Sequence, residues 1–309
     1  MLKYILKRVA YSLATLLAII TLTFFLMKAL PEGPFNNPKM KPEVKAALMT
    51  KYGLNKPLGE QYWIYMTNVF KGDFGSSIKF EGRNVTDIIK NNFPNSLALG
   101  WRAMLYASIF GILFGIIAAL KHQKVADYLV IAIAIIGVSV PSIIMGPVLA
   151  YYLGVRLMWF PVTVDKSQWS LILPSFVLGL SSLAFIARMM RTSMLDVMSQ
   201  DYIMTAKAKG LSSVQVIVRH MIRNAIMPVV TVLGPMFASI ITGSIVIESV
   251  FAVGGLGQYF VNSIMQQDYP MIMGVTIFYA ILIIASLLIV DVAYAFIDPR
   301  LKLSGKKGD

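Results

Sequence analysis

The sequence of 309 residues contains no cysteine and few charged residues. Without cysteine there is no disulfide framework and no thiolate metal site, and the redox compartment cannot be inferred from cysteine usage. Charged residues make up 14% of the chain, whereas soluble domains carry roughly 25%. Hydrophobic residues make up 57% and gather in long blocks. This composition is typical of an integral membrane protein.

Motifs that carry chemistry are also missing. The nucleotide-binding pattern G-x-x-x-x-G-K-[ST] does not occur. The nucleophile pattern G-x-S-x-G does not occur either, since GLSSL at Gly179 lacks the closing glycine. The two histidines, His122 and His220, lie in basic segments without an acid at ligand spacing. We therefore predict a chain that is not an enzyme, holds no metal and binds no cofactor itself.

Six apolar stretches are long enough to cross a hydrocarbon core, which needs about 20 helical residues. The first is expected to be an uncleaved span, because its apolar run exceeds a signal core and KALPEGPF offers no small-x-small cleavage site. Pro141, Pro147, Pro228 and Pro235 are candidate helix breaks that line a path, although ordinary kinking explains them equally well. The predicted spans are 9–27, 97–120, 128–155, 171–187, 225–247 and 271–290.

Positive charges gather in alternate loops. The positive-inside rule places these basic loops in the cytoplasm, together with both termini. This arrangement indicates a multi-pass protein of the cell membrane. The long segment after the first span then lies outside, because loops of that length translocate largely regardless of charge. The basic residues on the predicted inner side are Lys3, Lys7, Arg8, Lys121, Lys124, Arg188, Arg191, Lys207, Lys209, Arg219, Arg223, Arg300, Lys302, Lys306 and Lys307.

The expected organisation is an all-α chain in four parts. Residues 1–30 form the N-terminal tail and first span, 31–95 an extracytoplasmic segment, 96–298 a five-helix transmembrane domain, and 299–309 a cytoplasmic tail. The extracytoplasmic segment is predicted to contain two amphipathic helices, PEVKAALMTKYGL and EQYWIYMTNVF, and a turn at KGDFGSS. It is either a small lid on the spans or a surface that meets an external donor protein.

The basic segment 201–225 between two spans is the clearest candidate site. Asp201 is predicted to cap a short helix that ends at a left-handed Gly210. Ser212 and Gln215 match a capping box that starts a second helix. Leu211 is expected to pack at the junction of the two helices. The second helix is expected to present one apolar face of Val214, Ile217, Val218, Met221 and Ile222.

Three interpretations of this segment compete: a helix resting on anionic lipid, a lipid-regulated switch, and a docking element for a cytoplasmic protein. The glycine break favours docking, because two helices bent at Gly210 would project the turn between them away from the membrane. Few acids lie within the spans, and neither Glu248 nor Asp291 is near a midplane. Because proton- or ion-driven carriers usually place ionisable groups there, the path is not expected to power itself. AVGGLGQYF, with Gly254, Gly255 and Gly257, is predicted to be a flexible outer loop near a gate, close to Glu248.

The sequence DYIMTAKAKGL…RHMIRNAIMPVVTVLGP resembles the cytoplasmic signature loop of binding-protein-dependent ABC importer permeases. The likeness is to the oligopeptide, dipeptide and nickel branch, nearest to the B subunit of oligopeptide permeases. It extends over essentially the whole chain, through MLKYILKRVAYSLATL, YGLNKPLGEQY, GDFGSS, GVSVPSIIMGPVL, ITGSIVIESVFAVGGLGQYFVNSI and DYPMIMGVTIF…IVDVAYAFIDPRLKL.

This resemblance implies a type I importer permease (MetI-like) fold, in which the 201–225 segment docks on an ATPase subunit. It implies as partners a second permease, two cytoplasmic ATPase subunits that hold ATP and magnesium, an extracytoplasmic peptide-binding protein, peptide substrate and membrane lipid, and no nucleic acid. Met204 stands where the general loop has glutamate, which puts a charge-based contact there in doubt. The implied coupling residues are Thr205, Ala206, Lys207, Ala208, Lys209, Gly210, Leu211, Arg219 and Arg223.

Two rival functions remain at this point. A stand-alone channel or secondary carrier, anchored to lipid by its basic segment, would work without ATP or partners. A nickel or metal-chelate importer of the same family would use methionine and histidine in its path, although no histidine lies in a predicted span.

Overall fold

The computed structural model describes residues 2–29, 35, 41–80, 82–164, 168–242 and 244–297, with only the backbone of 2–4, 168 and 291–297. Within these ranges the chain is helical, with no named strand, so the all-α prediction is confirmed. The side chains of Lys3 and Asp291, residue Lys166 and the predicted tail 299–309 lie outside the described residues. The predicted four-part boundaries stay a prediction.

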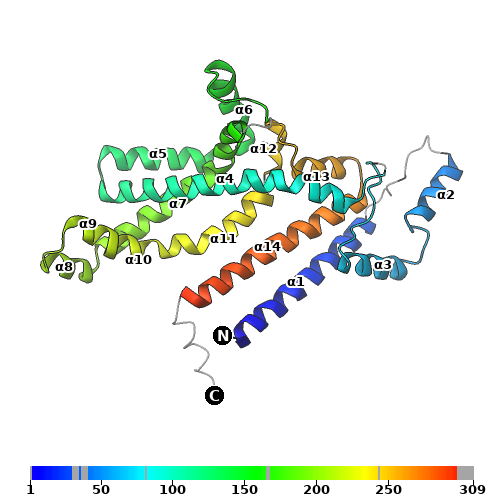
Figure 1. Ribbon diagram of the computed structural model, residues 1–309, viewed down its shortest axis with the longest axis horizontal. Coiled ribbons are helices and arrows are strands. Elements are labelled where there is room, and N and C mark those ends of the chain that lie inside the picture. Colours follow the sequence, from blue (N-terminus) through cyan, green and yellow to red (C-terminus); the bar gives the residue numbers. More distant parts are fainter. Residues whose placement is uncertain are drawn as a thin grey trace. The chain divides into compact units, whose positions relative to one another are not determined.

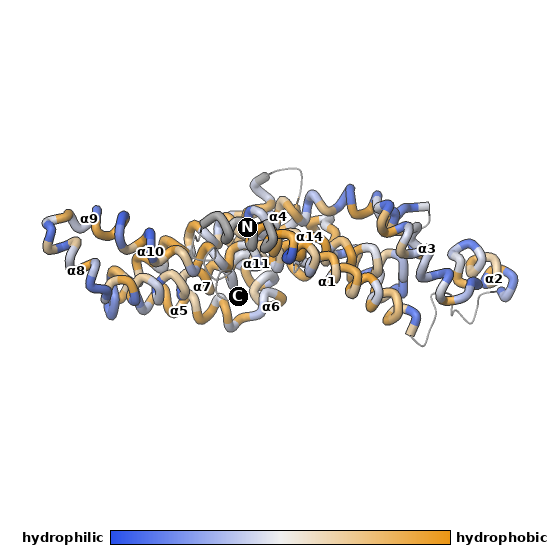
Figure 2. The backbone as a smooth tube through the Cα atoms, turned by 90° about the horizontal axis from the view of Figure 1, so that it is seen from below, coloured by the Kyte–Doolittle hydropathy of each residue, from blue (hydrophilic) through white to orange (hydrophobic). Residues whose placement is uncertain are grey.

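Four helices are long and apolar enough to cross a membrane: α1 (Leu2–Ala29), α4 (Val85–Leu120), α7 (Ile172–Met198) and α14 (Tyr269–Ile297). Two bent helix pairs pass the same test when each is taken together, which brings the number within the described residues to six. Figure 2 shows mainly hydrophobic residues along α1, α7 and α14. The six predicted spans therefore correspond to four single helices and two broken ones.

The described residues of Met1–Pro94 and Gly255–Leu288 form one compact unit. It contains α1, α2 (Pro42–Lys51), α3 (Leu58–Phe70), the first turns of α4, α13 (Leu256–Met265) and most of α14. Its buried core joins the first turns of α4 to α13 and α14 through Val85, Ile88, Ile89, Leu256, Met271, Val275 and Tyr279. The two helices predicted for the extracytoplasmic segment are present, although α2 buries none of its residues.

Asp268 fastens the GDFGSS turn to the start of α14 within this unit. Its carboxylate is fully buried and accepts hydrogen bonds from the Ser77 hydroxyl and from the backbone amides of Ile78 (3.1 Å) and Lys79 (3.2 Å). The amide of Met271, in the first turn of α14, also donates to it at 3.4 Å. The buried carboxylate oxygens are thus satisfied by a hydroxyl and by peptide amides.

The second compact unit comprises Asn95–Gly254 and residues from Ile289 onward. In Figure 1 the main part of α4 runs beside α7. Glycines allow this close approach: a Cβ on Gly111 would lie 2.8 Å from Ile186, and one on Gly115 would lie 2.6 Å from the Ala187 carbonyl oxygen. This G-x-x-x-G spacing is a recurring way to bring membrane helices together.

The helix breaks follow two of the four predicted prolines. Pro141 separates α5 (Val125–Ser139) from α6 (Ser142–Leu149), and the two parts of this span meet at 110°. A bend of 48° precedes α11 (Met227–Thr242), next to Pro228. The prediction is wrong for Pro147 and Pro235 as breaks, because α6 and α11 continue through them. The span of α5 and α6 ends in a π-helix, η1 (Ala150–Arg156), and a short 3-10 helix, η2 (Gln168–Leu171), precedes α7.

The predicted outer loop around AVGGLGQYF is more ordered than expected. Gly254 has a φ of +54°, a left-handed conformation that glycine adopts without strain. Gly255 then caps α13, and Gly257 is buried in its first turn, so the prediction of a flexible loop is wrong from Leu256 onward. Glu248 lies in α12 (Ile245–Val250), fully buried, and accepts a hydrogen bond from Ser244 at 2.5 Å.

Candidate functional site

The 201–225 segment folds into a helical hairpin between α7 and α11. It consists of α8 (Asp201–Ala208), a turn, α9 (Ser213–Gln215), the π-helix η3 (Val216–Ile222) and α10 (Arg223–Ala225). Figure 2 shows that hydrophilic residues concentrate in α8 and α9, in contrast to the apolar α7 that leads to them. The hairpin thus projects as a polar element from an apolar helix bundle.

The turn of the hairpin has the local structure that its residues predict. Lys209 ends α8 by donating to the Thr205 carbonyl at 3.0 Å, and Gly210 follows with a φ of +77°. The Ser212 hydroxyl accepts from the Gln215 amide, while the Gln215 side chain accepts from the Ser212 amide, which completes the predicted capping box. The predicted cap Asp201 is wrong, because Gln200 holds that position and Asp201 is the first helical residue.

One face of the hairpin is buried against the bundle. Ile203 is fully buried and Ala206 is 5% exposed, and both belong to a cluster with Met190 and Met194 of α7. Leu211 packs against the same cluster, as predicted. Ala206 was expected to shape a partner contact, but in this chain its methyl group faces the core.

The predicted apolar face of the second helix is only partly correct. Met221 is buried, but Val214 and Val218 are 69% and 54% exposed, and the buried position between them is Val216. The cause is the π-helix η3, whose i→i+5 hydrogen bonds change the period of the face from the ordinary helical one. Such wider turns in helices occur frequently at functional sites.

The opposite face of the hairpin is exposed and mixed in character. Its apolar members are Tyr202 and Met204 on α8 and Val214 and Val218 beyond the turn, with Met204 64% exposed. The other predicted coupling residues on this surface are Thr205, Lys207, Ala208, Lys209, Gly210, Arg219 and Arg223, all exposed. Exposed apolar side chains flanked by basic residues form a surface suited to a groove in a partner protein.

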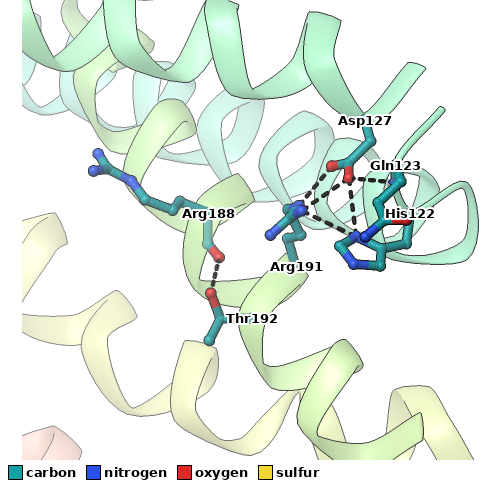
Figure 3. Close-up of polar contacts among 6 residues, drawn as sticks. All are labelled: His122, Gln123, Asp127, Arg188, Arg191 and Thr192. Atoms are coloured by element: carbon teal, nitrogen blue, oxygen red, sulfur yellow. Dashed lines mark hydrogen bonds and ion pairs between the residues drawn. The ribbon is translucent and has the colours of Figure 1, made fainter. Parts of the chain in front are cut away.

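An ion-pair cluster lies between α5 and α7, the helix that leads into the hairpin (Figure 3). Arg191 of α7 donates to both carboxylate oxygens of Asp127, from Nε at 2.6 Å and from Nη2 at 2.8 Å. The Asp127 side chain is 2% exposed and also accepts from the Gln123 amide at 3.0 Å. This two-pronged geometry is the strongest form of an arginine–carboxylate pair.

His122 completes this cluster. Its Nδ1 lies 3.1 Å from Asp127 Oδ2 and 3.2 Å from Arg191 Nη2. A single ring nitrogen can donate to the carboxylate or accept from the guanidinium, but not both at once. His122 thus contacts an acid that the spacing of the sequence did not single out, Asp127, five residues further along the chain. The cluster ties together the turn after α4, the start of α5 and the last third of α7.

The sequence analysis missed Asp127 and counted Arg191 only as a basic loop residue. The signal was local for the acid: Asp127 is the third residue of α5, a position from which a carboxylate reaches back to the preceding amides. No local signal pairs it with Arg191, because 64 residues separate the two.

The other predicted site residues are not gathered with the hairpin. Pro141 and Glu248 belong to the end of the bundle formed by α6 and α12, and α8 and α9 lie at the opposite end of α5 and α7 (Figure 1). The hairpin is thus the candidate site, the ion-pair cluster lies on the helix that leads into it, and the α6–α12 end is a separate region of the same unit.

Two family models match the chain. Residues 1–100 match the N-terminal part of binding-protein-dependent transport system membrane components, and residues 111–303 match the binding-protein-dependent transport system inner membrane component. The dipeptide transport system permease protein DppB of Bacillus subtilis is 46% identical, with all of both chains covered. The oligopeptide transport system permease protein OppB of Haemophilus influenzae is 42% identical, over 98% of this chain and all of the relative.

A solved structure shares the fold. The methionine ABC transporter MetNI, in an inward-facing conformation, superposes with a TM-score of 0.56 at 18% identity, over 68% of this chain and 96% of the matched chain. Identity at this level shows the arrangement of helices alone, and this arrangement agrees with the predicted MetI-like fold. Since a family model covers more than half of the sequence and full-length relatives exceed 40% identity, the chain belongs to the family of binding-protein-dependent transport system inner membrane components.

Proposed function

We propose that this chain is a permease subunit of a peptide importer driven by ATP. The observation that carries the proposal is its likeness, over the full length, to permeases named for dipeptide and oligopeptide transport. Because both names occur at similar identity, the proposed substrate is a short peptide of either class. The chain forms half of the translocation path and leaves ATP hydrolysis to other subunits.

The proposed assembly contains a second, homologous permease, two ATPase subunits that hold ATP and magnesium, and an external peptide-binding protein. Both termini lie in the cytoplasm, because the basic residues of the hairpin and the turn after α4 fall on one side of the membrane. The segment with α2 and α3 then faces the external receptor. Peptide passes from the receptor into a cavity between the two permeases.

The hairpin is the proposed mechanical link to the ATPase. Its exposed face, with Met204, Val214 and Val218, fits into a groove of an ATPase subunit. Movement of that subunit pushes on α8, and the buried cluster that Ile203 shares with residues of α7 carries the displacement into the bundle. The Asp127–Arg191 ion pair makes α5 follow α7. ATP-driven closure thereby changes which side of the membrane the path opens to.

The test is reconstitution of the complex purified through a tag on this chain. We expect a second permease and ATPase subunits to copurify, and receptor loaded with peptide to stimulate both ATP hydrolysis and peptide uptake into proteoliposomes. Uptake of solute by the chain alone, without ATP, would instead establish a channel or carrier. Stimulation by a nickel chelate and not by peptide would reject the peptide substrate but keep the importer.

A further inference from the structure

Helix α3 is held against the side of α1. The Tyr62 hydroxyl and the Thr21 hydroxyl share a hydrogen bond of 2.8 Å. The Tyr62 ring packs against Phe24 and Phe25 of α1, and the Tyr65 ring stacks on Phe24. Two tyrosines of α3 thus pack on two phenylalanines of α1, and these contacts fix the position of α3 against α1.

The contacts also fix the depth of α3 along α1. Thr21, Phe24, Phe25 and Lys28 follow one another at helical spacing and form a single stripe along α1. Lys28 donates to the Gln61 side chain at 2.5 Å. Thr21 precedes the end of α1 at Ala29 by eight residues, or about 12 Å of helix. Helix α3 therefore lies beside the last two turns of an apolar span, not above its end.

The face of α3 away from α1 is apolar and exposed. Trp63 and Phe70 are seven residues apart, which places them on the same side of the helix, and they are 70% and 71% exposed. The single acid of α3, Glu60, pairs with Lys56 at 2.7 Å. Lys71 directly follows the helix and is exposed. Helix α3 thus presents two large rings between flanking lysines.

We propose that α3 is an interfacial helix that immerses Trp63 and Phe70 in the membrane leaflet around the carboxyl end of α1. The proposed occupant of this face is phospholipid, at the boundary of acyl chains and headgroups. Trp side chains concentrate at this boundary because the ring is apolar and its N–H is polar. Helices that lie in the interface carry an apolar face and flanking cations.

The argument for lipid is continuity with the surface of α1. Leu22, Phe25 and Leu26 are 60%, 45% and 66% exposed on this span, and apolar side chains on a membrane span at this level face acyl chains. Phe25 stacks directly on Tyr62 of α3 with ring centroids 5.6 Å apart. The exposed apolar surface of α1 therefore reaches α3 through the contact of Phe25 with Tyr62. The helix anchors the segment after α1 to the membrane surface.

The absence of cysteine from the chain provides a direct test. A spin label is attached to Trp63→Cys or Phe70→Cys in the complete transporter, with cysteine-free partner subunits, in phospholipid nanodiscs. Collision rates with oxygen, which partitions into lipid, are compared with those of a water-soluble nickel chelate. Leu26→Cys is the matched lipid control on α1, and Glu43→Cys, on the exposed surface of α2, is the water control.

We expect both α3 labels to collide more with oxygen than with nickel chelate, as the Leu26→Cys label does. A ratio equal to that of Glu43→Cys would place the face in water and overturn the proposal. Low collision rates with both reagents would also overturn it, because they would show that a protein partner covers the face. All substituted side chains on α3 are exposed, so none of these changes removes a core contact.

Discussion

The two faces of the hairpin at 201–225 differ in the burial of their side chains. The inward face is apolar and closed, with Ile203 fully buried among Met190 and Met194 of α7. The outward face is mixed in character and includes the apolar side chains of Met204, Val214 and Val218, which remain exposed. Packing within the chain therefore accounts for the inward residues, and the proposed docking on an ATPase subunit would account for the outward ones.

This difference separates structural damage from loss of coupling. A change on the inward face removes contacts inside the chain, so the subunit is destabilised before any partner binds. A change on the outward face should leave the chain intact and weaken only the proposed docking. Substitutions at neighbouring positions of α8 should thus have different consequences, although they lie one residue apart in sequence.

The largest expected effect follows from Ile203→Asp. Truncation of a buried isoleucine costs about 2–5 kcal/mol, and an unpaired carboxylate in an apolar core adds a further desolvation cost. We expect the subunit to be lost from the membrane fraction, as measured by its steady-state amount. Met204→Asp, the adjacent exposed position, should be present in normal amount. Equal amounts of both variants would contradict the two-face account.

The next effect concerns the ion pair between Asp127 and Arg191. Arg191→Ala leaves the buried Asp127 carboxylate without its arginine partner. Removing one partner of a buried ion pair lowers the free energy of unfolding by about 3 kcal/mol. We expect a lower midpoint of thermal unfolding in detergent. Arg188→Ala is the matched control, because this exposed arginine precedes Arg191 on α7 and points away from Asp127 in Figure 3. If the two variants unfold at the same temperature, the ion pair does not hold α5 to α7.

A smaller effect is expected at the turn. Gly210→Ala places a Cβ in open space but at a φ of +77°, where a side chain costs about 1–2 kcal/mol. Gly59→Ala in α3 is the control, because its Cβ also meets nothing but its backbone is helical. The control should stabilise by up to about 1 kcal/mol. Thermal unfolding should therefore shift in opposite directions for the two variants.

The smallest effect is expected for Ser212→Ala, which removes the capping hydroxyl from the start of the second helix. Loss of such a cap costs about 1 kcal/mol. Ser213→Ala changes the adjacent exposed serine, which holds no capping position. We expect a slightly lower unfolding midpoint for Ser212→Ala alone. An identical shift in both variants would mean that the capping box does not stabilise the hairpin.

The sequence predicted the parts of this site that depend on local chemistry. Ser212, Gln215 and Gly210 have the predicted roles, because a capping box and a left-handed turn are decided within a few residues. The face of the second helix could not be predicted correctly, because η3 departs from the ordinary helical period. The Asp127–Arg191 pair joins residues that only the packing of α5 on α7 brings together.

The same distinction applies to the fold. Hydrophobic runs predicted six spans, because length and composition decide whether a helix can cross the membrane. They did not predict which prolines break a helix: Pro141 does, whereas Pro147 continues inside α6. A proline is tolerated where neighbouring groups satisfy the freed carbonyl, and this depends on tertiary packing. Asp268 was likewise invisible, since its partner Ser77 lies 191 residues away.

The most direct test of the docking face is peptide uptake with Met204→Asp and Val214→Asp in the reconstituted transporter. Val44→Asp makes the same change on α2, at a position that is also exposed. We predict that the hairpin variants insert normally but retain ATPase subunits at least about tenfold less tightly, equivalent to about 1.4 kcal/mol, and lose uptake, while Val44→Asp retains both. Normal retention and uptake in both hairpin variants would contradict the claim that this face docks on the ATPase.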